Sequence, residues 1–147
     1  MTPISAPAPR AGQSKRAPVL WGLAVGAIQA ASPLAFWWLD QATVQALLLA
    51  LIAAVYIGFA VADGRPRVIA VESSVTFAFV LLAAAAVTGS AWLLVLGYAG
   101  HGLKDLWQER SHYVTGTRWW PPFCAAVDFL VAIVLIIEIA LGVGFHR

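Results

Sequence analysis

Apolar runs of membrane-spanning length alternate with short polar segments along most of the chain. Five runs predict helices over residues 19–39, 42–62, 68–87, 91–110 and 123–145. A helix needs about 20 mostly apolar residues to cross the hydrocarbon core of a bilayer. We therefore expect an all-α fold, an integral membrane bundle of five transmembrane helices within residues 19–147. Residues 1–18 are rich in proline and lack apolar periodicity, so we expect a disordered cytoplasmic tail there.

Small residues recur at helical spacing in the first two runs. The first contains the GxxxG pair Gly22 and Gly26, and the second repeats a small residue at every fourth position: Ala46, Ala50, Ala54, Gly58 and Ala62. Small residues allow close helix approach, although Gly and Ala are also simply common in membrane helices. The faces of these two spans could hold other helices of the chain, a second copy of it, or a membrane partner. Ser32-Pro33 predicts a kink in the first span.

Composition and charge support a membrane location. The chain is 61% hydrophobic and 11% charged, whereas soluble domains carry about 25% charged residues. The lipid bilayer is therefore the expected partner, and the net charge of +2 gives no reason to expect nucleic-acid binding. A single cysteine, Cys124, excludes an internal disulfide. Serine-hydrolase, P-loop and dinucleotide-binding motifs are absent from the sequence.

The distribution of lysine and arginine predicts the orientation. With the N-terminus inside, eight of the nine basic residues fall on the cytoplasmic side: Arg10, Lys15, Arg16, Arg65, Arg67, Lys104, Arg110 and Arg118. Only Arg147 falls outside. Cytoplasmic loops of membrane proteins carry an excess of lysine and arginine. We therefore predict a multi-pass protein with its N-terminus inside and its C-terminus outside (N-in/C-out).

The candidate site centres on the stretch Gly97–Gln108, where an apolar run gains one polar face. His101, Lys104, Asp105 and Gln108 lie within roughly 60° of His101 on a helical wheel. The predicted orientation places Glu72 and Asp128 in the same cytoplasmic layer. Because a charged group facing lipid is costly, we expect one polar cavity open to the cytoplasm. Its predicted lining is His101, Asp105, Glu72, Asp128, Lys104 and Gln108.

Two interpretations of this layer remain open. His101, Asp105, Glu72 and Asp128 offer four ligand groups that would suit a divalent metal ion, or Lys104 and Arg65 simply pair with the carboxylates. Glu138 lies about 15 Å beyond Asp128 along the last helix. Asp128 and Glu138 could thus form a proton or cation relay, or Glu138 could be neutral and bonded to Gln29 or Gln45.

The sequence restricts the function of the protein less than it restricts the membrane topology. The stretches HGLKDLWQ and RWWPPFCAAVD resemble signatures of small bacterial multi-pass membrane proteins, a resemblance that implies the cytoplasmic (inner) membrane and no activity. The leading hypothesis is transport of a proton, cation or small solute. One alternative is a membrane-embedded enzyme that uses His101 and Asp105 on a lipid-soluble substrate. Another is an accessory subunit of a membrane complex.

Overall fold

The computed structural model describes residues 15–145, and within them the chain is all-α, without strands. Its helices are α1 (Arg16–Ala30), α2 (Ser32–Ala35), α3 (Gln41–Asp63), α4 (Pro66–Thr88), α5 (Trp92–Ser111) and α6 (Trp120–Leu141). The first 14 residues of the expected tail, with Arg10, and the C-terminal Arg147 lie outside the described residues. The tail was expected to reach residue 18, but α1 already begins at Arg16, because a proline such as Pro18 is tolerated in a first helical turn.

Local sequence explains where the helices begin and end. The Asp40 carboxylate accepts a hydrogen bond from the backbone N–H of Thr43 at 2.9 Å and so caps the start of α3. Gly64, with φ of 78°, ends α3 in a left-handed conformation, and Pro66 is the first residue of α4. α1 ends at Ala30 and α2 begins with Ser32-Pro33, so the first run is interrupted where a kink was predicted.

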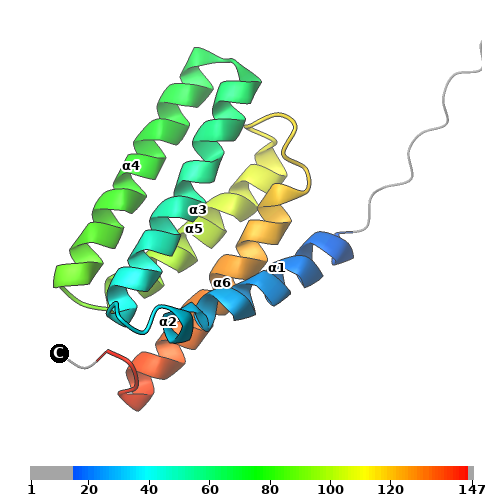
Figure 1. Cartoon of the computed structure of the whole chain (residues 1–147). Helices are drawn as coiled ribbons and strands as arrows, with labels where there is room; N and C mark the ends of the chain where they lie inside the picture. The colour runs from blue at the N-terminus through cyan, green and yellow to red at the C-terminus, as the bar shows by residue number, and fades with distance from the viewer. Residues whose placement is uncertain (1–14, 146–147) are drawn as a thin grey trace, which may run out of the picture.

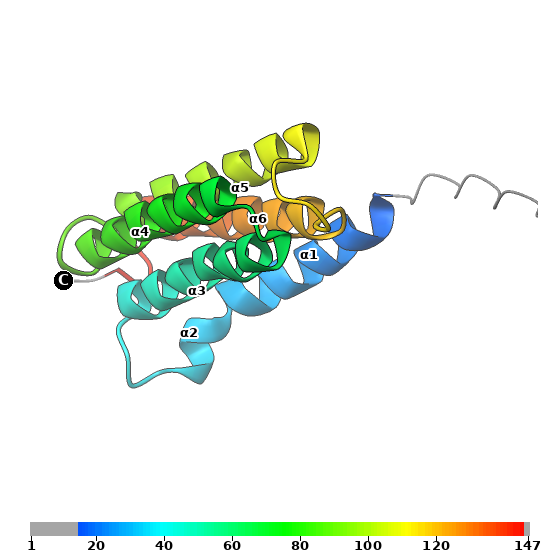
Figure 2. The same ribbon diagram turned by 90° about the horizontal axis from the view of Figure 1, so that it is seen from above.

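The long helices alternate in direction, so the bundle has two ends (Figure 1 and Figure 2). The end that carries residues 112–119 is called the loop end, and it also holds the α3–α4 connection and the start of α1. The opposite end holds α2, the α4–α5 connection and the end of α6. α6 packs against both α1 and α5, α3 packs along α4, and α5 also contacts α3 and α4. One face of α5 therefore lies at the centre of the bundle.

Three of the five expected spans are long and apolar enough to cross a membrane, namely α3, α4 and α6. The first run falls short because α1 has only 15 residues before the break at Ala31, or roughly 22 Å at 1.5 Å per residue. The fourth run, α5, has 20 residues, but its second half carries Lys104, Asp105, Glu109 and Arg110. α1 is therefore too short to count as a span, and α5 is too polar.

Glycines in α1 allow it to lie directly against α6. A Cβ atom at Gly22 would collide with the carbonyl oxygen of Phe123, and one at Gly26 would lie 3.1 Å from the Cα of Val127. The GxxxG face of the first run is therefore occupied by α6 of the same chain. This contact explains why the sequence has glycine at both positions.

The small-residue face predicted on the second run is not continuous. Ala46 is buried, whereas Ala54, Gly58 and Ala62 are exposed. Residues spaced by four drift about 40° around a helix at each step, so a long series cannot stay in one interface. The buried residues of α3 instead follow spacings of three and four, for example Leu49, Ala53, Tyr56 and Ala60.

The outer surface of the bundle is strongly apolar. Large hydrophobic side chains are exposed on every long helix, including Ile28, Leu51, Phe77, Leu96 and Ile133. Soluble monomers rarely expose apolar surface on this scale, whereas a bilayer would cover it. The hydrophobic core is built of small and branched side chains, and Leu49, Leu94 and Val131 are fully buried there.

Candidate functional site

α5 directs a row of polar side chains into the bundle. Tyr98, His101, Asp105 and Gln108 are each at most 1% exposed. Their spacings of three, four and three residues keep them on one helix face, as the sequence predicted for the last three. From Tyr98 to Gln108 the row covers about 15 Å at a rise of 1.5 Å per residue. Polar groups therefore occupy several successive levels of an otherwise apolar core.

The centre of the row is a triad formed by His101 and Asp105 of α5 and Asp128 of α6. His101 Nδ1 lies 2.8 Å from Asp128 Oδ2 and 3.4 Å from Asp105 Oδ2. All three residues are fully buried. One nitrogen of one imidazole thus faces two carboxylates, which also lie beside each other. The triad therefore places two acidic side chains around a single basic one.

Several atoms of the triad lack a hydrogen-bond partner among residues 15–145. They include His101 Nε2, Asp105 Oδ1 and Asp128 Oδ1. The surroundings are aromatic: the Phe79 ring meets the imidazole edge-on at 5.0 Å, and the Tyr56 ring lies at 5.9 Å. Buried polar atoms are almost always hydrogen-bonded in proteins. This concentration of unpartnered atoms makes the triad the candidate ligand site of the described residues.

A second cluster, the paired cluster, is formed by Glu72 of α4 with Lys104 and Gln108 of α5. Lys104 Nζ lies 2.8 Å from Glu72 Oε2, and Gln108 Nε2 donates a hydrogen bond to Glu72 Oε1 at 2.5 Å. The Lys104 ammonium also sits 3.5 Å from the centre of the Tyr56 ring, a cation–π contact. One positive and one negative charge are therefore matched inside this cluster. Tyr56 lies between the paired cluster and the triad and contacts both.

The loop end closes over these clusters. Val114 is 1% exposed, packs with Tyr56 and Val68, and donates its backbone N–H to Gln108 Oε1 at 3.3 Å. Within residues 15–145 the expected open cavity is not seen: Glu72, His101, Asp105 and Asp128 are buried, and Val114 packs against Tyr56 of α3 and Val68 of α4.

An ion pair holds this loop in place. The guanidinium of Arg65 bonds to Asp63 at 2.6 and 2.8 Å and to the carbonyl oxygen of Tyr113 at 2.5 Å. Asp63 also accepts hydrogen bonds from the backbone N–H and the hydroxyl of Thr115 at 2.9 and 2.7 Å. The carboxylate beside it raises the pKa of Arg65, so the guanidinium stays charged. Arg65 thus pairs with Asp63 and with none of the carboxylates of the triad or the paired cluster.

A neutral hydrogen-bond network lies on the other side of the triad. Gln29 Nε2 donates to the Tyr98 hydroxyl at 2.9 Å, and this hydroxyl in turn donates to the carbonyl oxygen of Gln45 at 2.8 Å. Gln45 Nε2 lies 3.4 Å from the carbonyl oxygen of Gln29. These three buried residues join α1, α3 and α5 and continue the row of polar groups toward the opposite end.

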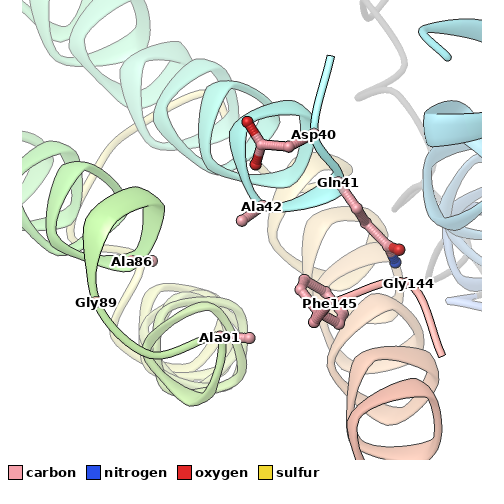
Figure 3. A pocket seen from close by; sticks show the side chains of 8 residues that line it. All are labelled: Asp40, Gln41, Ala42, Ala86, Gly89, Ala91, Gly144 and Phe145. Carbon is pink, nitrogen blue, oxygen red and sulfur yellow. The ribbon is translucent and has the colours of Figure 1, made fainter. Parts of the chain in front are cut away.

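Glu138 lies at the opposite end of the bundle. Its hydrogen-bond partner is neither of the two residues expected from the sequence. Its carboxylate accepts a hydrogen bond from Gln41 Nε2 at 2.6 Å, and neither Gln29 nor Gln45 is its partner. Gln41 is the first residue of α3 and is level with the end of α6, whereas Gln45 is one turn deeper. Gln41 also lines an open pocket of about 240 Å³ beside Asp40 and Phe145 (Figure 3). Glu138 is thus bonded to a residue that lines this pocket, and the relay between Asp128 and Glu138 stays a prediction.

The six residues predicted to share one cavity therefore fall into two groups. His101, Asp105 and Asp128 form the triad, and their potential ligand atoms all lie within 4.8 Å of one another. Glu72, Lys104 and Gln108 form the paired cluster. The four-ligand metal set predicted from the sequence loses Glu72, because Lys104 and Gln108 already bond both of its oxygens.

Two tyrosines of the site were not predicted. Tyr56 and Tyr98 are fully buried, although both stand in apolar runs and were assigned no role. The signal was present in the sequence: Tyr98 is three residues before His101 and hence on its helix face. His112, in the loop after α5, is exposed, and the thiol of Cys124 is buried.

The chain matches no protein-family model, no curated protein and no solved structure. Its chemistry must therefore be inferred from its own residues. An imidazole beside two carboxylates can bind a metal ion or exchange protons. The triad is fully buried, so only a small ligand could contact it directly.

Proposed function

We propose that this protein is an integral membrane transporter of a small cation, with the triad as its buried binding station. In this proposal α1 with α2 and the four other long helices cross the cytoplasmic membrane five times, N-in/C-out. The loop end then faces the cytoplasm, and the pocket beside Gln41 and Glu138 faces outward.

The outer surface and the charge distribution support the membrane placement. The polar side chains of His101, Asp105 and Gln108 on α5 are buried, while Leu96, Leu103 and Trp107 are exposed on its outer face. Such a helix can lie in a bilayer when other helices cover its polar side. Basic residues gather at the loop end, as cytoplasmic segments require.

The observation that carries the transport proposal is the continuous series of buried polar groups along α5. It runs from Gln108 past the triad to Tyr98. Each charged group inside a membrane costs a few kcal/mol, and polar residues at such depths usually mark an ion or proton pathway. Packing alone requires no polar side chain at these levels.

The geometry favours a small cation over a larger substrate. The triad carries two carboxylates and one imidazole, which is a cation-attracting set. A lipid-soluble substrate or an organic solute would need an opening at this level, but every member of the triad is fully buried. A bare ion needs only brief openings between side chains.

Flux through reconstituted vesicles tests this proposal. We would compare the wild type with His101→Asn and, as a matched control, with His112→Asn in the exposed loop. Asparagine tolerates the left-handed backbone at position 112, where φ is 51°. Trapped dyes would report lumenal pH and the entry of Zn²⁺ or Mn²⁺ after a gradient is imposed.

The wild type and His112→Asn should dissipate at least one of these gradients faster than protein-free vesicles, and His101→Asn should lose most of that rate. Rates for the wild type that equal those of empty vesicles, for protons and both metals, would refute transport. Unchanged flux in His101→Asn would refute the role of the triad.

Topology can be tested separately. A reporter that is active only in the cytoplasm should be active when fused after Arg65 or Ser111 and inactive when fused after Arg147. The reason is the eight-to-one split of basic residues. An active reporter after Arg147 would overturn the orientation and the assignment of the pocket to the outer face.

A further inference from the structure

We propose that the triad binds one divalent first-row transition-metal ion, such as Zn²⁺ or Mn²⁺, through His101, Asp105 and Asp128. This inference rests on the proposed function, because it names the class of cation for the same site. The first observation behind it is the distance between the possible ligand atoms. One ligand atom from each residue can be chosen so that all lie within 4.8 Å of one another. Ligands around one zinc ion, at bond lengths of about 2.0–2.2 Å, lie roughly 3–4 Å apart.

Only small side-chain adjustments would therefore be needed to close three ligands around an ion. The backbones that carry them are fixed by helix packing: His101 and Asp105 are one turn apart on α5, and Asp128 faces them from α6. Ligands held on rigid elements are more precisely placed than ligands on loops.

The mixture of donors selects the type of ion. Ca²⁺ and Mg²⁺ prefer oxygen ligands alone, whereas imidazole suits first-row transition metals. Two carboxylates and one neutral imidazole would balance the charge of a divalent ion. That balance matters because all three residues are fully buried and an uncompensated charge there is costly.

Charge pairing within the protein does not explain the triad. The nearest ammonium, Lys104, is already bonded to Glu72 at 2.8 Å. The Tyr56 hydroxyl interacts with Asp105 but forms no hydrogen bond of regular geometry. Asp105 Oδ1 and Asp128 Oδ1 have no hydrogen-bond partner among residues 15–145. Glu72 Oε2 accepts no regular hydrogen bond either, but it lies 2.8 Å from the Lys104 ammonium.

Binding would be coupled to proton release. His101 Nδ1 faces both carboxylates and is the nitrogen placed to become the ligand. A ligating imidazole nitrogen must be free of its proton, so a proton held at Nδ1 or shared with a carboxylate would leave as the metal–nitrogen bond forms. Metal loading should therefore acidify a weakly buffered solution.

Metal analysis of the purified full-length chain tests the site. The protein would carry no histidine tag, would be incubated with ZnCl₂ or MnCl₂, and would be freed of loose metal by gel filtration. We expect one ion per wild-type chain and per His112→Asn chain. Affinity should fall at least about tenfold in Asp105→Asn and in Asp128→Asn. Retention of full affinity in both carboxylate variants would overturn the proposal.

A measurement on the wild type guards against variants that misfold. Co²⁺ added to the wild type should produce visible absorption bands of a nitrogen- and oxygen-ligated ion, and Zn²⁺ should abolish them. Absence of any spectral change would refute the site without recourse to a variant. Metal binding without flux in vesicles would refute transport and leave the site intact, whereas proton flux without metal binding would refute the site alone.

Discussion

The two polar clusters of α5 are built from similar residues but differ in how their acidic and basic groups are matched. Each combines α5 side chains with one carboxylate from a neighbouring helix, Glu72 from α4 or Asp128 from α6. In the paired cluster, one ammonium meets one carboxylate and an amide fills its second oxygen. In the triad, two carboxylates share one imidazole nitrogen and several atoms have no partner among residues 15–145.

This difference separates a structural role from a binding role within one helix. A matched buried pair needs both of its members, because removal of one leaves an uncompensated charge. An unmatched set of acids gains from an added positive charge. Substitutions that remove a carboxylate should therefore have opposite effects on stability in the two clusters.

The largest effect is expected from Glu72→Gln. This change leaves the Lys104 ammonium without its counter-charge inside the bundle, and breaking a buried pair in this way typically costs about 3–5 kcal/mol. We expect a large fall in the unfolding temperature in detergent. A fall no larger than that of a surface substitution would show that Lys104 is solvated and the cluster is not matched.

A double substitution sharpens this result. Glu72→Met combined with Lys104→Met removes both charges and keeps similar volume, so stability should return to within about 2 kcal/mol of the wild type. The test is the coupling free energy from the two single variants and the double variant. If the double variant is as unstable as the sum of the singles, the two side chains do not act as a pair.

A smaller effect of opposite sign is expected from Asp105→Asn. In metal-free protein this change removes one of the two acidic groups that crowd a single imidazole nitrogen, so we expect a stability change within about 1 kcal/mol or a gain. Addition of Zn²⁺ should raise the unfolding temperature of the wild type and leave that of the variant unchanged. A large destabilisation of the metal-free variant would mean that the triad is itself a matched structural cluster.

The smallest effect is expected at the surface. Lys15 Nζ lies 2.5 Å from Glu109 Oε1, but the Lys15 side chain is 76% exposed. Exposed ion pairs contribute about 0–1 kcal/mol. Lys15→Ala should therefore leave the unfolding temperature nearly unchanged and serves as the reference for both clusters. An effect comparable to that of Glu72→Gln would remove the distinction between buried and exposed pairs.

Sequence periodicity predicted which residues form the buried polar face of α5. It did not predict which residues of the neighbouring helices contact that face. A helical wheel states which residues of one helix share a face, and His101, Asp105 and Gln108 do. It does not state which neighbouring helix they meet. Glu72 was therefore grouped with His101, although α4 brings it to Lys104 and Gln108.

Depth along the helices was predicted only approximately. Asp128 was correctly placed level with His101, because both were counted from the same membrane surface. Glu138 was assigned the wrong amide, since the partner depends on where α3 begins relative to the end of α6. Closure of the loop end depended on the bonds of Asp63 and Arg65 to residues 113–115, which no periodicity encodes.

The most direct test of the central claim is a diffraction or density map of the wild-type protein loaded with Zn²⁺, with anomalous scattering recorded at the zinc edge. We expect one strong peak between His101, Asp105 and Asp128, inside the bundle. No peak there, or a peak only beside the exposed His112, would contradict it.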